Sequence, residues 1–257
     1  MFDSKIGGGD AHSITVRGHD LVNDLFDRDF IDVMALELLG QFPSPQLKRM
    51  LNLFLVSATD HGLTPSALSA RLTLHGAPEA MQGALAAGLL GAGSRFLGVI
   101  EHAARFLRDA LPKQDSYTDE ELRHYAEECV KANKAAKRKI PGVGHPIHVD
   151  GDPRCEKMFA IAKECGYYGN YSRFAVELAA AAARLSGKKI PLNATGCKGA
   201  IVLDMGLTPE LGKALTMIGR SVGLMAHIIE EQQNPIAQKV WDMASGNGLN
   251  LQLRSRS

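Results

Sequence analysis

Residues 140–154 read Ile-Pro-Gly-Val-Gly-His-Pro-Ile-His-Val-Asp-Gly-Asp-Pro-Arg, and this segment separates two stretches that have helical periodicity. Glycines and prolines interrupt it repeatedly, so a loop is expected here. A loop rich in glycine lets the backbone approach a bound molecule closely. The loop also carries two imidazoles, His145 and His148, and it ends at the guanidinium group of Arg154. These residue types make the loop a candidate binding site.

The end of this loop has the residue pattern that begins a helix. Asp152 followed by Pro153 is typical of an N-cap and a first helical position. Arg154 is then expected in the first turn, where its side chain is held rigidly. A positioned imidazole and a rigid arginine suit an anionic, oxygen-rich substrate. The spacing alone also allows a solvated connection between two helices with incidental histidines.

The composition is that of an ordinary globular protein. The chain has 257 residues, 45% of them hydrophobic and 22% charged, with a formal net charge of +1. This material is enough for a sizeable core, and the charge gives no argument for a nucleic-acid or membrane partner. No Cys-x-x-Cys pair occurs and no hydrophobic signal core opens the chain, so we expect free thiols, no metal and a cytoplasmic location. The cysteines are Cys129, Cys155, Cys165 and Cys197.

Helical periodicity recurs along the chain, and aromatic residues are only 6% of it. Both features favour closely packed helices over a β-sandwich. The clearest helix start is at Thr118, where Thr118-x-x-Glu121 has the pattern of a capping box. A short extended piece is expected near Ile14. The expected helices cover residues 21–40 in two parts, 45–58, 65–74, 79–111 in one or two parts, 118–139, 153–164, 172–185, 208–231 and 235–244.

Two further motifs carry polar groups on predicted helices. Thr-Asp-His-Gly at 59–62 places His61 at a helix C-terminus, where the dipole favours its charged form. Such a histidine can also simply cap carbonyl groups. Further along, Arg220, Gly223 and His227 share one helical face with Leu224. An arginine on a face lined by glycine favours carboxylate binding over a structural ion pair.

Taken together, these motifs resemble the citrate synthase superfamily, which includes the citryl-CoA lyase module of ATP citrate lyase. Residues 142–154 are similar to its Gly-x-Gly-His and Asp-Pro-Arg signature, and residues 58–62 are similar to the Ala-Asp-His-Gly of the lyase module. Residues 93–98 resemble the Gly-Asp-Arg-Phe-Gly-Gly of that module, and residues 219–227 resemble Gly-Arg-Ser-x-Gly-x-x-Gly-His. The resemblance extends from about Ile14 to Trp241.

The resemblance implies an all-α enzyme with a large and a small helical domain and an active-site cleft between them. The large domain is expected to comprise residues 1–97 and 201–257, and the small domain residues 98–200. The family forms dimers through helices rich in alanine and glycine, so a homodimer or a higher homo-oligomer is expected.

The sequence departs from the family pattern at three places, and the first of them favours the lyase branch. Phe96 stands where citrate synthases carry a histidine that stabilises the acetyl-CoA enol. Thr195 stands in Leu192-Asn-Ala-Thr-Gly196, where the family has Leu-Asn-Val-Asp-Gly and its acid/base carboxylate. A hydroxyl group cannot replace a carboxylate as a base. Lys239 is the nearest cation to the place of a third carboxylate-binding arginine, so we expect a substrate smaller or less charged than citryl-CoA.

The function implied by the resemblance is cleavage of a 3-hydroxyacyl-CoA to acetyl-CoA and a 2-oxo acid, with no tightly bound cofactor and no metal. The expected catalytic residues are His61, His145 and Thr195, and the expected carboxylate-binding residues are Arg154 and Arg220. The expected coenzyme A contacts are Ile140, Pro141, Gly142, Val143, Gly144, Lys188 and Lys189. Two alternatives stay open, namely citrate synthase-type condensation and a catalytically weakened paralogue that binds an acyl-CoA or a carboxylate.

Overall fold

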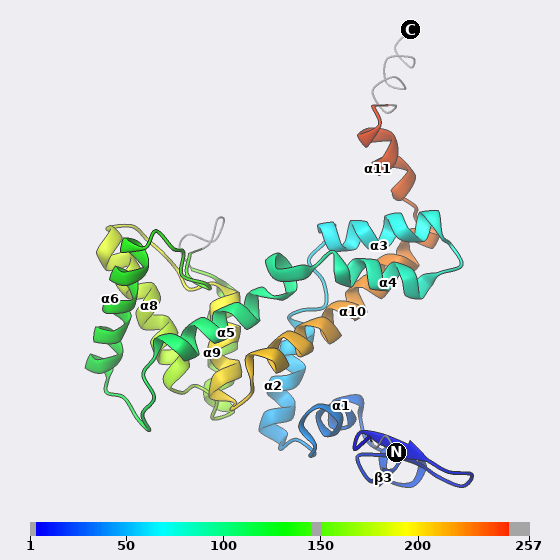
Figure 1. The fold of residues 1–257 in the computed structure, drawn as a ribbon, viewed down its shortest axis with the longest axis horizontal. Coiled ribbons are helices and arrows are strands. Elements are labelled where there is room, and N and C mark those ends of the chain that lie inside the picture. The colour runs from blue at the N-terminus through cyan, green and yellow to red at the C-terminus, as the bar shows by residue number, and fades with distance from the viewer. Residues whose placement is uncertain (1–3, 145–150, 247–257) are drawn as a thin grey trace. The chain divides into compact units, whose positions relative to one another are not determined.

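The structure is a computed structural model that describes residues 4–144 and 151–246, and the predicted all-α class is confirmed (Figure 1). None of the described helices is long and apolar enough to cross a membrane. The helices are α1 (Phe30–Leu39), α2 (Pro45–Val56), α3 (Pro65–Gly76), α4 (Met81–Leu90), α5 (Val99–Ala110), α6 (Asp119–Ala135), α7 (Pro153–Glu164), α8 (Asn170–Ser186), α9 (Ala194–Asp204), α10 (Pro209–Gln233) and α11 (Ala237–Ala244), with π-helical turns η1 (Leu21–Leu25) and η2 (Gly93–Leu97).

A small antiparallel sheet precedes the helices. Its strands are β1 (Gly7–Gly9), β2 (Ile14–Val16) and β3 (His19–Asp20), in the order β1-β2-β3. The extended piece expected near Ile14 is therefore β2. Arg17 follows it with a φ of 50°, and its Nη2 donates to the carbonyl oxygen of Glu37 at 2.6 Å. This bond ties the sheet to α1.

Contacts within the chain divide it into two compact units, each of which is described by itself. Unit 1 comprises residues 1–53 and 103–211, and unit 2 comprises residues 54–102 and 212–257. The domain boundaries expected from the sequence, with a small domain at 98–200, stay a prediction.

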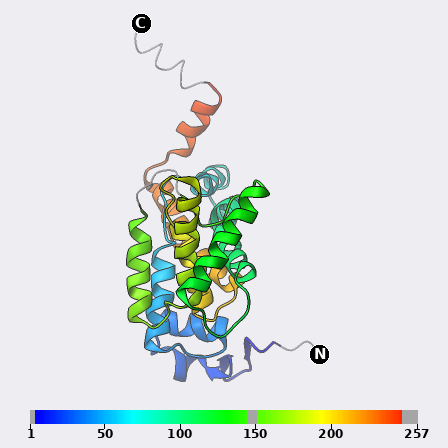
Figure 2. The ribbon, with the colours of Figure 1, turned by 90° about the vertical axis from the view of Figure 1, so that its left-hand side faces the viewer.

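The core of unit 1 lies between α8 and its neighbours α6 and α9 (Figures 1 and 2). Alanines on α8 allow these helices to approach closely, and larger side chains fill the remaining space. The fully buried side chains of this core include Leu122, Ala126, Phe174, Ala175, Leu178, Ala181 and Ala200.

The core of unit 2 joins the α3–α4 hairpin to α10 (Figure 1). Gly88 of α4 makes this packing possible, since a Cβ atom there would lie 2.9 Å from Leu224 Cδ1 and 3.2 Å from Ala70 Cβ. The buried core residues are Ala67, Ala70, Leu74, Ala84, Leu224 and Ile228.

Two predicted helix starts are confirmed. Thr118 and Glu121 form the reciprocal capping box, and Asp152 caps α7 with Pro153 at its first position. The stretch 79–111, predicted as one or two helices, contains the two α-helices α4 and α5, with the π-helical turn η2 between them. The chain leaves the α-helical path after α4 and forms the π-helical turn η2 before α5, in a region where glycines weaken the helix.

Candidate active site

The loop at 140–144 is fixed in unit 1 by the segment that leads into α9. The amide of Gly144 donates to the carbonyl oxygen of Pro191 at 2.7 Å, and Val143 forms an isolated bridge with Leu192. Asn193 binds the loop twice, with its amide at 2.9 Å from the Gly142 oxygen and its Nδ2 at 2.8 Å from the Gly144 oxygen. The side-chain oxygen of Asn193 also caps α9, so one residue holds the loop and begins the helix.

A contact between two glycines brings this loop onto α9. A Cβ atom at Gly142 would lie 2.4 Å from the Gly196 Cα, and a Cβ atom at Gly196 would lie 2.7 Å from the Gly142 oxygen. Gly142 has a φ of 84°, a value that side chains disfavour. The backbone of the loop therefore lies directly beside Thr195, the residue before Gly196.

Asp152 links the start of α7 to the start of α9. Its side chain is fully buried, and it accepts hydrogen bonds from Arg154 Nε at 2.9 Å, from Arg154 Nη2 at 2.8 Å and from the Ala194 amide at 3.0 Å. Burial raises the pKa of Asp152, but the bonds from Arg154 and Ala194 outweigh it and lower the pKa to about 2. Arg154 is thus held in place, with about half of its side chain exposed.

The first turn of α9 presents a half-buried Thr195. Its amide donates to the N-cap oxygen of Asn193 at 3.0 Å, as expected at a helix N-terminus. One turn later the same helix buries Lys198, which is 8% exposed. Unit 1 therefore brings together three of the predicted groups, namely the 140–144 loop, Arg154 and Thr195.

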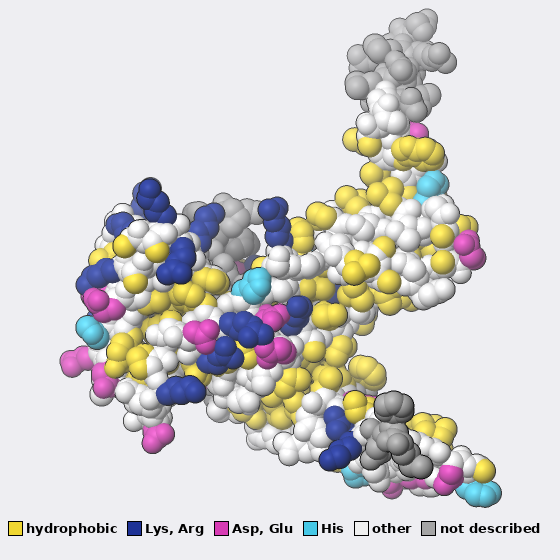
Figure 3. Space-filling view, in the orientation of Figure 1, with side chains coloured by type: hydrophobic (Ala, Val, Ile, Leu, Met, Phe, Trp, Pro, Cys, Tyr) yellow, Lys and Arg dark blue, Asp and Glu magenta, His cyan; other side chains and the backbone are white. Residues whose placement is uncertain are grey.

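Basic side chains gather near this loop, where α6 and α8 end. Lys134 of α6 donates to the carbonyl oxygen of Leu185 at 3.3 Å, which joins the two helix ends. Lys188 and Lys189 are exposed in the segment that follows, next to the residues that pair with the loop. Figure 3 shows lysine and arginine side chains over this end of the bundle. The predicted coenzyme A contacts at Lys188 and Lys189 stay predictions.

In unit 2, α10 packs tightly against the segment that carries His61. A Cβ atom at Gly219 would lie 2.5 Å from the Leu55 oxygen, and one at Gly223 would lie 1.7 Å from the Thr59 oxygen. Only glycine allows this approach. The glycine-lined face recognised in the sequence therefore receives the backbone just before His61, whose side chain is exposed.

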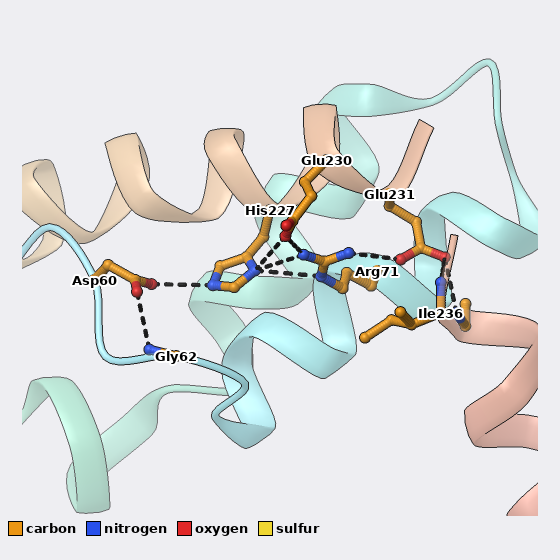
Figure 4. Close-up of polar contacts among 8 residues, drawn as sticks. Asp60, Gly62, Arg71, His227, Glu230, Glu231 and Ile236 are labelled. Carbon is orange, nitrogen blue, oxygen red and sulfur yellow. Dashed lines mark hydrogen bonds and ion pairs between the residues drawn. The ribbon is translucent and has the colours of Figure 1, made fainter. Parts of the chain in front are cut away.

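A polar network continues from this segment along α10 (Figure 4). Asp60 Oδ1 lies 3.0 Å from His227 Nε2, and Asp60 Oδ2 accepts from the Gly62 amide at 2.9 Å. Burial raises the pKa of Asp60, but the Gly62 and His61 amides and His227 lower it further, so the net change is downward. On its other side, His227 Nδ1 meets the guanidinium of Arg71 at 3.0 and 3.2 Å.

Arg71 and Glu231 anchor this network in the interior of unit 2. Their side chains are only 3% and 4% exposed, and Arg71 Nη1 donates to Glu231 Oε2 at 2.8 Å. Glu231 Oε1 also accepts from the amides of Ile236 and Ala237, at 2.9 and 2.8 Å. Arg71 pairs in addition with the exposed Glu230. A buried ion pair with its hydrogen bonds made is costly to disrupt.

Arg220 lies on the same face of α10 and differs from Arg71 in its bonding. Its Nε is buried and has no hydrogen-bond partner among the described residues. Burial lowers the pKa of the guanidinium group, against the charge of Asp60. A buried donor without a partner is costly, and an anionic oxygen of a ligand would satisfy it.

The predicted residues are therefore distributed over both units. Arg154, Thr195 and the 140–144 loop belong to unit 1, and His61 and Arg220 belong to unit 2. His145 and His148 lie outside the described residues. Phe96 is exposed in η2, and Lys239 is exposed on α11. The described residues contain no group of three or more His, Cys, Asp or Glu side chains that could hold a metal ion.

The family model described as Citrate synthase, C-terminal domain, matches residues 12–240. The chain belongs to the citrate synthase family. The solved citryl-CoA lyase from Hydrogenobacter thermophilus is similar, with 34% identity, a TM-score of 0.80 and coverage of 91% of this chain and 88% of that chain. The resemblance stated from the sequence and the citrate synthase-like fold are therefore confirmed.

Larger proteins of the citrate synthase family are also similar. ATP citrate lyase from Methanothrix soehngenii, solved with citrate and coenzyme A, has a TM-score of 0.73 at 23% identity, over 90% of this chain and 39% of that chain. That likeness shows the fold alone. The probable ATP-citrate synthase of Dictyostelium discoideum is 26% identical over 79% of this chain and 34% of its own length. The chain thus spans about a third of that curated relative.

Sequence reasoning missed the polar groups that support this family's motifs in the structure. Arg71 lies in the helix expected at residues 65–74, where no motif marks it, and Asp60 has no signal of its own beyond its place before His61. A signal was present for His227, which lies on the same face as Arg220. Asp152 was identified as an N-cap, but its pairing with Arg154 was not. In the structure, Arg71 and Asp60 contact His227, and Asp152 contacts Arg154.

Proposed function

We propose that the chain cleaves a 3-hydroxyacyl-CoA, citryl-CoA or a smaller relative, to acetyl-CoA and a 2-oxo acid. The observation that carries this proposal is the likeness to the Hydrogenobacter thermophilus citryl-CoA lyase, which covers most of both chains at 34% identity. Phe96 and Thr195 replace the histidine and the aspartate of the citrate synthase pattern, and these replacements support cleavage over condensation.

The proposed chemistry is a retro-aldol cleavage. A base removes the proton of the substrate hydroxyl group, the bond between the carbinol carbon and the α-carbon breaks, and the electron pair forms the thioester enolate. The carbinol carbon becomes the ketone of the 2-oxo acid, and a proton delivered to the enolate gives acetyl-CoA. We propose His145 as the base that removes the hydroxyl proton. His61 forms a hydrogen bond to the same region of the substrate. A water molecule held by Thr195 supplies the proton to the enolate.

We assign the substrate carboxylates to Arg154 and Arg220, because a guanidinium group binds a carboxylate through two parallel hydrogen bonds. The Nε of Arg220 supports its assignment, because it is buried and has no hydrogen-bond partner within residues 4–144 and 151–246. Arg154 is already oriented by Asp152 through Nε and Nη2, so a ligand would use its remaining N–H groups. Citryl-CoA carries two free carboxylates, because the third carboxyl group of citrate forms the thioester, so the two arginines match it in number.

Coenzyme A is proposed to bind at the 140–144 loop, through the backbone of Ile140, Pro141, Gly142, Val143 and Gly144. The close contact of Gly142 with α9 supports a firmly held backbone there, and residues 140–144 are only partly buried. Lys188 and Lys189 would neutralise phosphate groups of the same ligand. No tightly bound cofactor is included in this proposal, and the arginines and imidazoles supply the electrophilic environment.

A second candidate function is a catalytically weakened paralogue that binds an acyl-CoA or a carboxylate without turnover. Thr195 supports it, because the family's carboxylate is absent there. Citrate synthase-type condensation is a third candidate, which both Phe96 and Thr195 oppose.

The test is a mass-spectrometric screen of the purified chain against CoA thioesters of hydroxy-di- and tricarboxylic acids. We expect acetyl-CoA and a 2-oxo acid from at least one thioester. Formation of a thioester from acetyl-CoA and a 2-oxo acid, with no cleavage, would support the synthase. Calorimetric binding of CoA esters without turnover would support the paralogue and contradict the lyase proposal.

A further inference from the structure

We propose that His227 is a positioning residue that holds the turn carrying His61 through a hydrogen bond to Asp60. The proposal rests on the proposed function, in which His61 contacts the substrate. The two carboxylate oxygens of Asp60, the residue before His61, have different partners. One carboxylate oxygen of Asp60 meets His227 Nε2 at 3.0 Å, and the other accepts from the Gly62 amide at 2.9 Å (Figure 4).

Arg71 fixes which nitrogen of His227 carries the hydrogen atom. A guanidinium group contains only donors, and Arg71 Nε and Nη2 lie 3.2 and 3.0 Å from His227 Nδ1. Nδ1 therefore accepts, and the hydrogen atom is on Nε2, facing the Asp60 carboxylate. The tautomer that donates to Asp60 is thus set by a buried arginine.

Arg71 cannot turn away easily, because its other side is paired with the buried Glu231 at 2.8 Å. Glu231 is held in turn by the amides of Ile236 and Ala237. The order of bonds is therefore Glu231, Arg71, His227, Asp60 and the turn. Each donor in this series has an acceptor, and each acceptor has a donor. A polar network whose hydrogen bonds are all made is rigid, so it holds Asp60 in one position.

The turn itself has little freedom once Asp60 is held. The Thr59 oxygen is in contact with the Gly223 backbone, and Gly62 has a φ of 71°, in the left-handed region. His61 lies between these two fixed points. Loss of the bond from His227 would leave Asp60 with the Gly62 amide but without its link to α10, and His61 would lose its orientation.

A direct catalytic role for His227 is a different hypothesis, and the bonding argues against it. Both ring nitrogens already have partners within the protein, and only 12% of the side chain is exposed. A general base needs a free nitrogen within reach of the substrate. The network leaves His227 with a supporting role.

The experiment compares His227→Gln with His227→Leu in the full chain. The glutamine amide keeps an N–H group for Asp60, whereas leucine keeps only the volume. We expect His227→Leu to lower kcat for citryl-CoA cleavage about 10- to 100-fold, the range typical of a displaced catalytic group. The Kd for coenzyme A, measured by calorimetry, should change less than twofold, because its proposed contacts lie in unit 1. His227→Gln should keep kcat within about threefold of wild type.

His75→Gln is the matched control, because His75 is an exposed histidine of the same unit whose Nε2 contacts Gln238 at 3.2 Å. It should leave kcat unchanged. Combining His227→Leu with Asp60→Ala should cause no further loss beyond the larger single effect, since both remove one interaction. Equal losses in the Gln and Leu variants, or a folded Leu variant with wild-type kcat, would overturn the proposal. If the Leu variant does not fold, His227→Asn, whose amide is too short to reach Asp60, takes its place.

A spectroscopic measurement separates this proposal from the proposed function. Long-range 1H–15N spectra of histidine-labelled protein, assigned with single variants, should show His227 protonated on Nε2 and not on Nδ1. The His61 signal should move in the Leu variant and stay in place in the Gln variant. If wild type cleaves no CoA thioester, the proposed function fails, and these spectra alone decide the positioning role. A His227 signal protonated on Nδ1 would refute it.

Discussion

At the scale of single residues, two arginines of unit 2 differ in their partners, and we expect one to support the structure and the other to bind a ligand. Arg71 is buried, and it contacts the carboxylate of Glu231 and the imidazole of His227. The Glu231 carboxylate balances its positive charge. Arg220 is held nearby with a buried Nε that lacks a partner among the described residues. Replacement of Arg71 should therefore damage folding, whereas replacement of Arg220 should damage ligand binding.

Arg220→Lys is expected to lower kcat/KM about 10- to 100-fold, because lysine keeps the charge but loses the planar donor pair. The melting temperature should change by less than about 2 °C. The matched control is Arg184→Lys, which alters an arginine that pairs with Glu127 on the surface of unit 1. Kinetics of Arg220→Lys equal to those of the control would remove Arg220 from the site.

Thr195→Asp restores the family's carboxylate at the start of α9. If Thr195 faces the α-carbon of the acyl-CoA, the variant should exchange solvent deuterium into acetyl-CoA faster than wild type. General acid-base groups contribute about 10²- to 10⁴-fold, so even a partial gain is measurable by mass spectrometry. Thr195→Asn is the control of similar shape without a base. Coenzyme A binding with no gain in exchange would place Thr195 away from the α-carbon.

Asp152→Asn should destabilise the protein in a pH-dependent way. The native pKa of about 2 lies below the unfolded value of about 3.9. The ionised carboxylate therefore contributes about 2 kcal/mol above pH 5, and this contribution is lost as the pH falls towards 2. Urea unfolding of wild type and variant at pH 7 and pH 2.5 measures the difference. If the free energies of unfolding of wild type and variant differed by the same amount at pH 7 and at pH 2.5, the assigned pairing with Arg154 would be contradicted.

At the scale of elements, α8 begins with an unusual cap, since its N-cap residue is Gly169 and has no side chain to offer. Asp204, the last residue of α9, replaces it by accepting from the amides of Gly169, Tyr171 and Ser172 at 2.9 to 3.0 Å. The carboxylate therefore joins two helices that build the core of unit 1 and position Thr195.

Asp204→Ala should lower the free energy of unfolding by about 2–3 kcal/mol, because several amides lose their acceptor at once. Asp204→Asn keeps one acceptor oxygen and should lose less. Thermal unfolding followed by circular dichroism gives both values. Identical melting temperatures for wild type and Asp204→Ala would show that water replaces the cap without cost.

The elements also show what a sequence can predict. The starts at Thr118 and Asp152 were predictable, because a cap depends on residues within a few positions of each other. The helix α9 was not expected, because it is buried on nearly every side and has no amphipathic period. The network at His227 was not predictable either, since Arg71 lies 156 positions away from it and only the fold brings them together.

At the scale of the whole molecule, we propose one exposed side of α10 as the surface that meets a second copy of the chain. Val222 and Ile229 are apolar and exposed, and their spacing of seven positions places them on one side of this helix. The homodimer expected from the family resemblance is proposed to bury this face, since exposed apolar patches commonly mark interfaces. The compartment in which it assembles stays a prediction.

Sedimentation equilibrium should therefore give twice the mass of the chain at micromolar concentration. Val222→Glu places a charge on the apolar face and should shift the equilibrium towards monomer at least tenfold. Gln82→Glu, an exposed change on α4 of the same unit, should leave it unchanged. A monomer in the wild-type sample would rule out the proposed interface.

The contact between Gly142 and Gly196 limits how this protein can vary. Where two side chains clash, a larger residue at one position can be offset by a smaller one at its neighbour. Here the side chain at both positions is already a single hydrogen atom, the smallest one possible. A Cβ atom added at either position would lie 2.4 to 2.7 Å from the backbone of the other. No second change can make room for the first. In a library of random substitutions selected for folding, both codons should therefore return as glycine, even where the surrounding core accepts many alternatives.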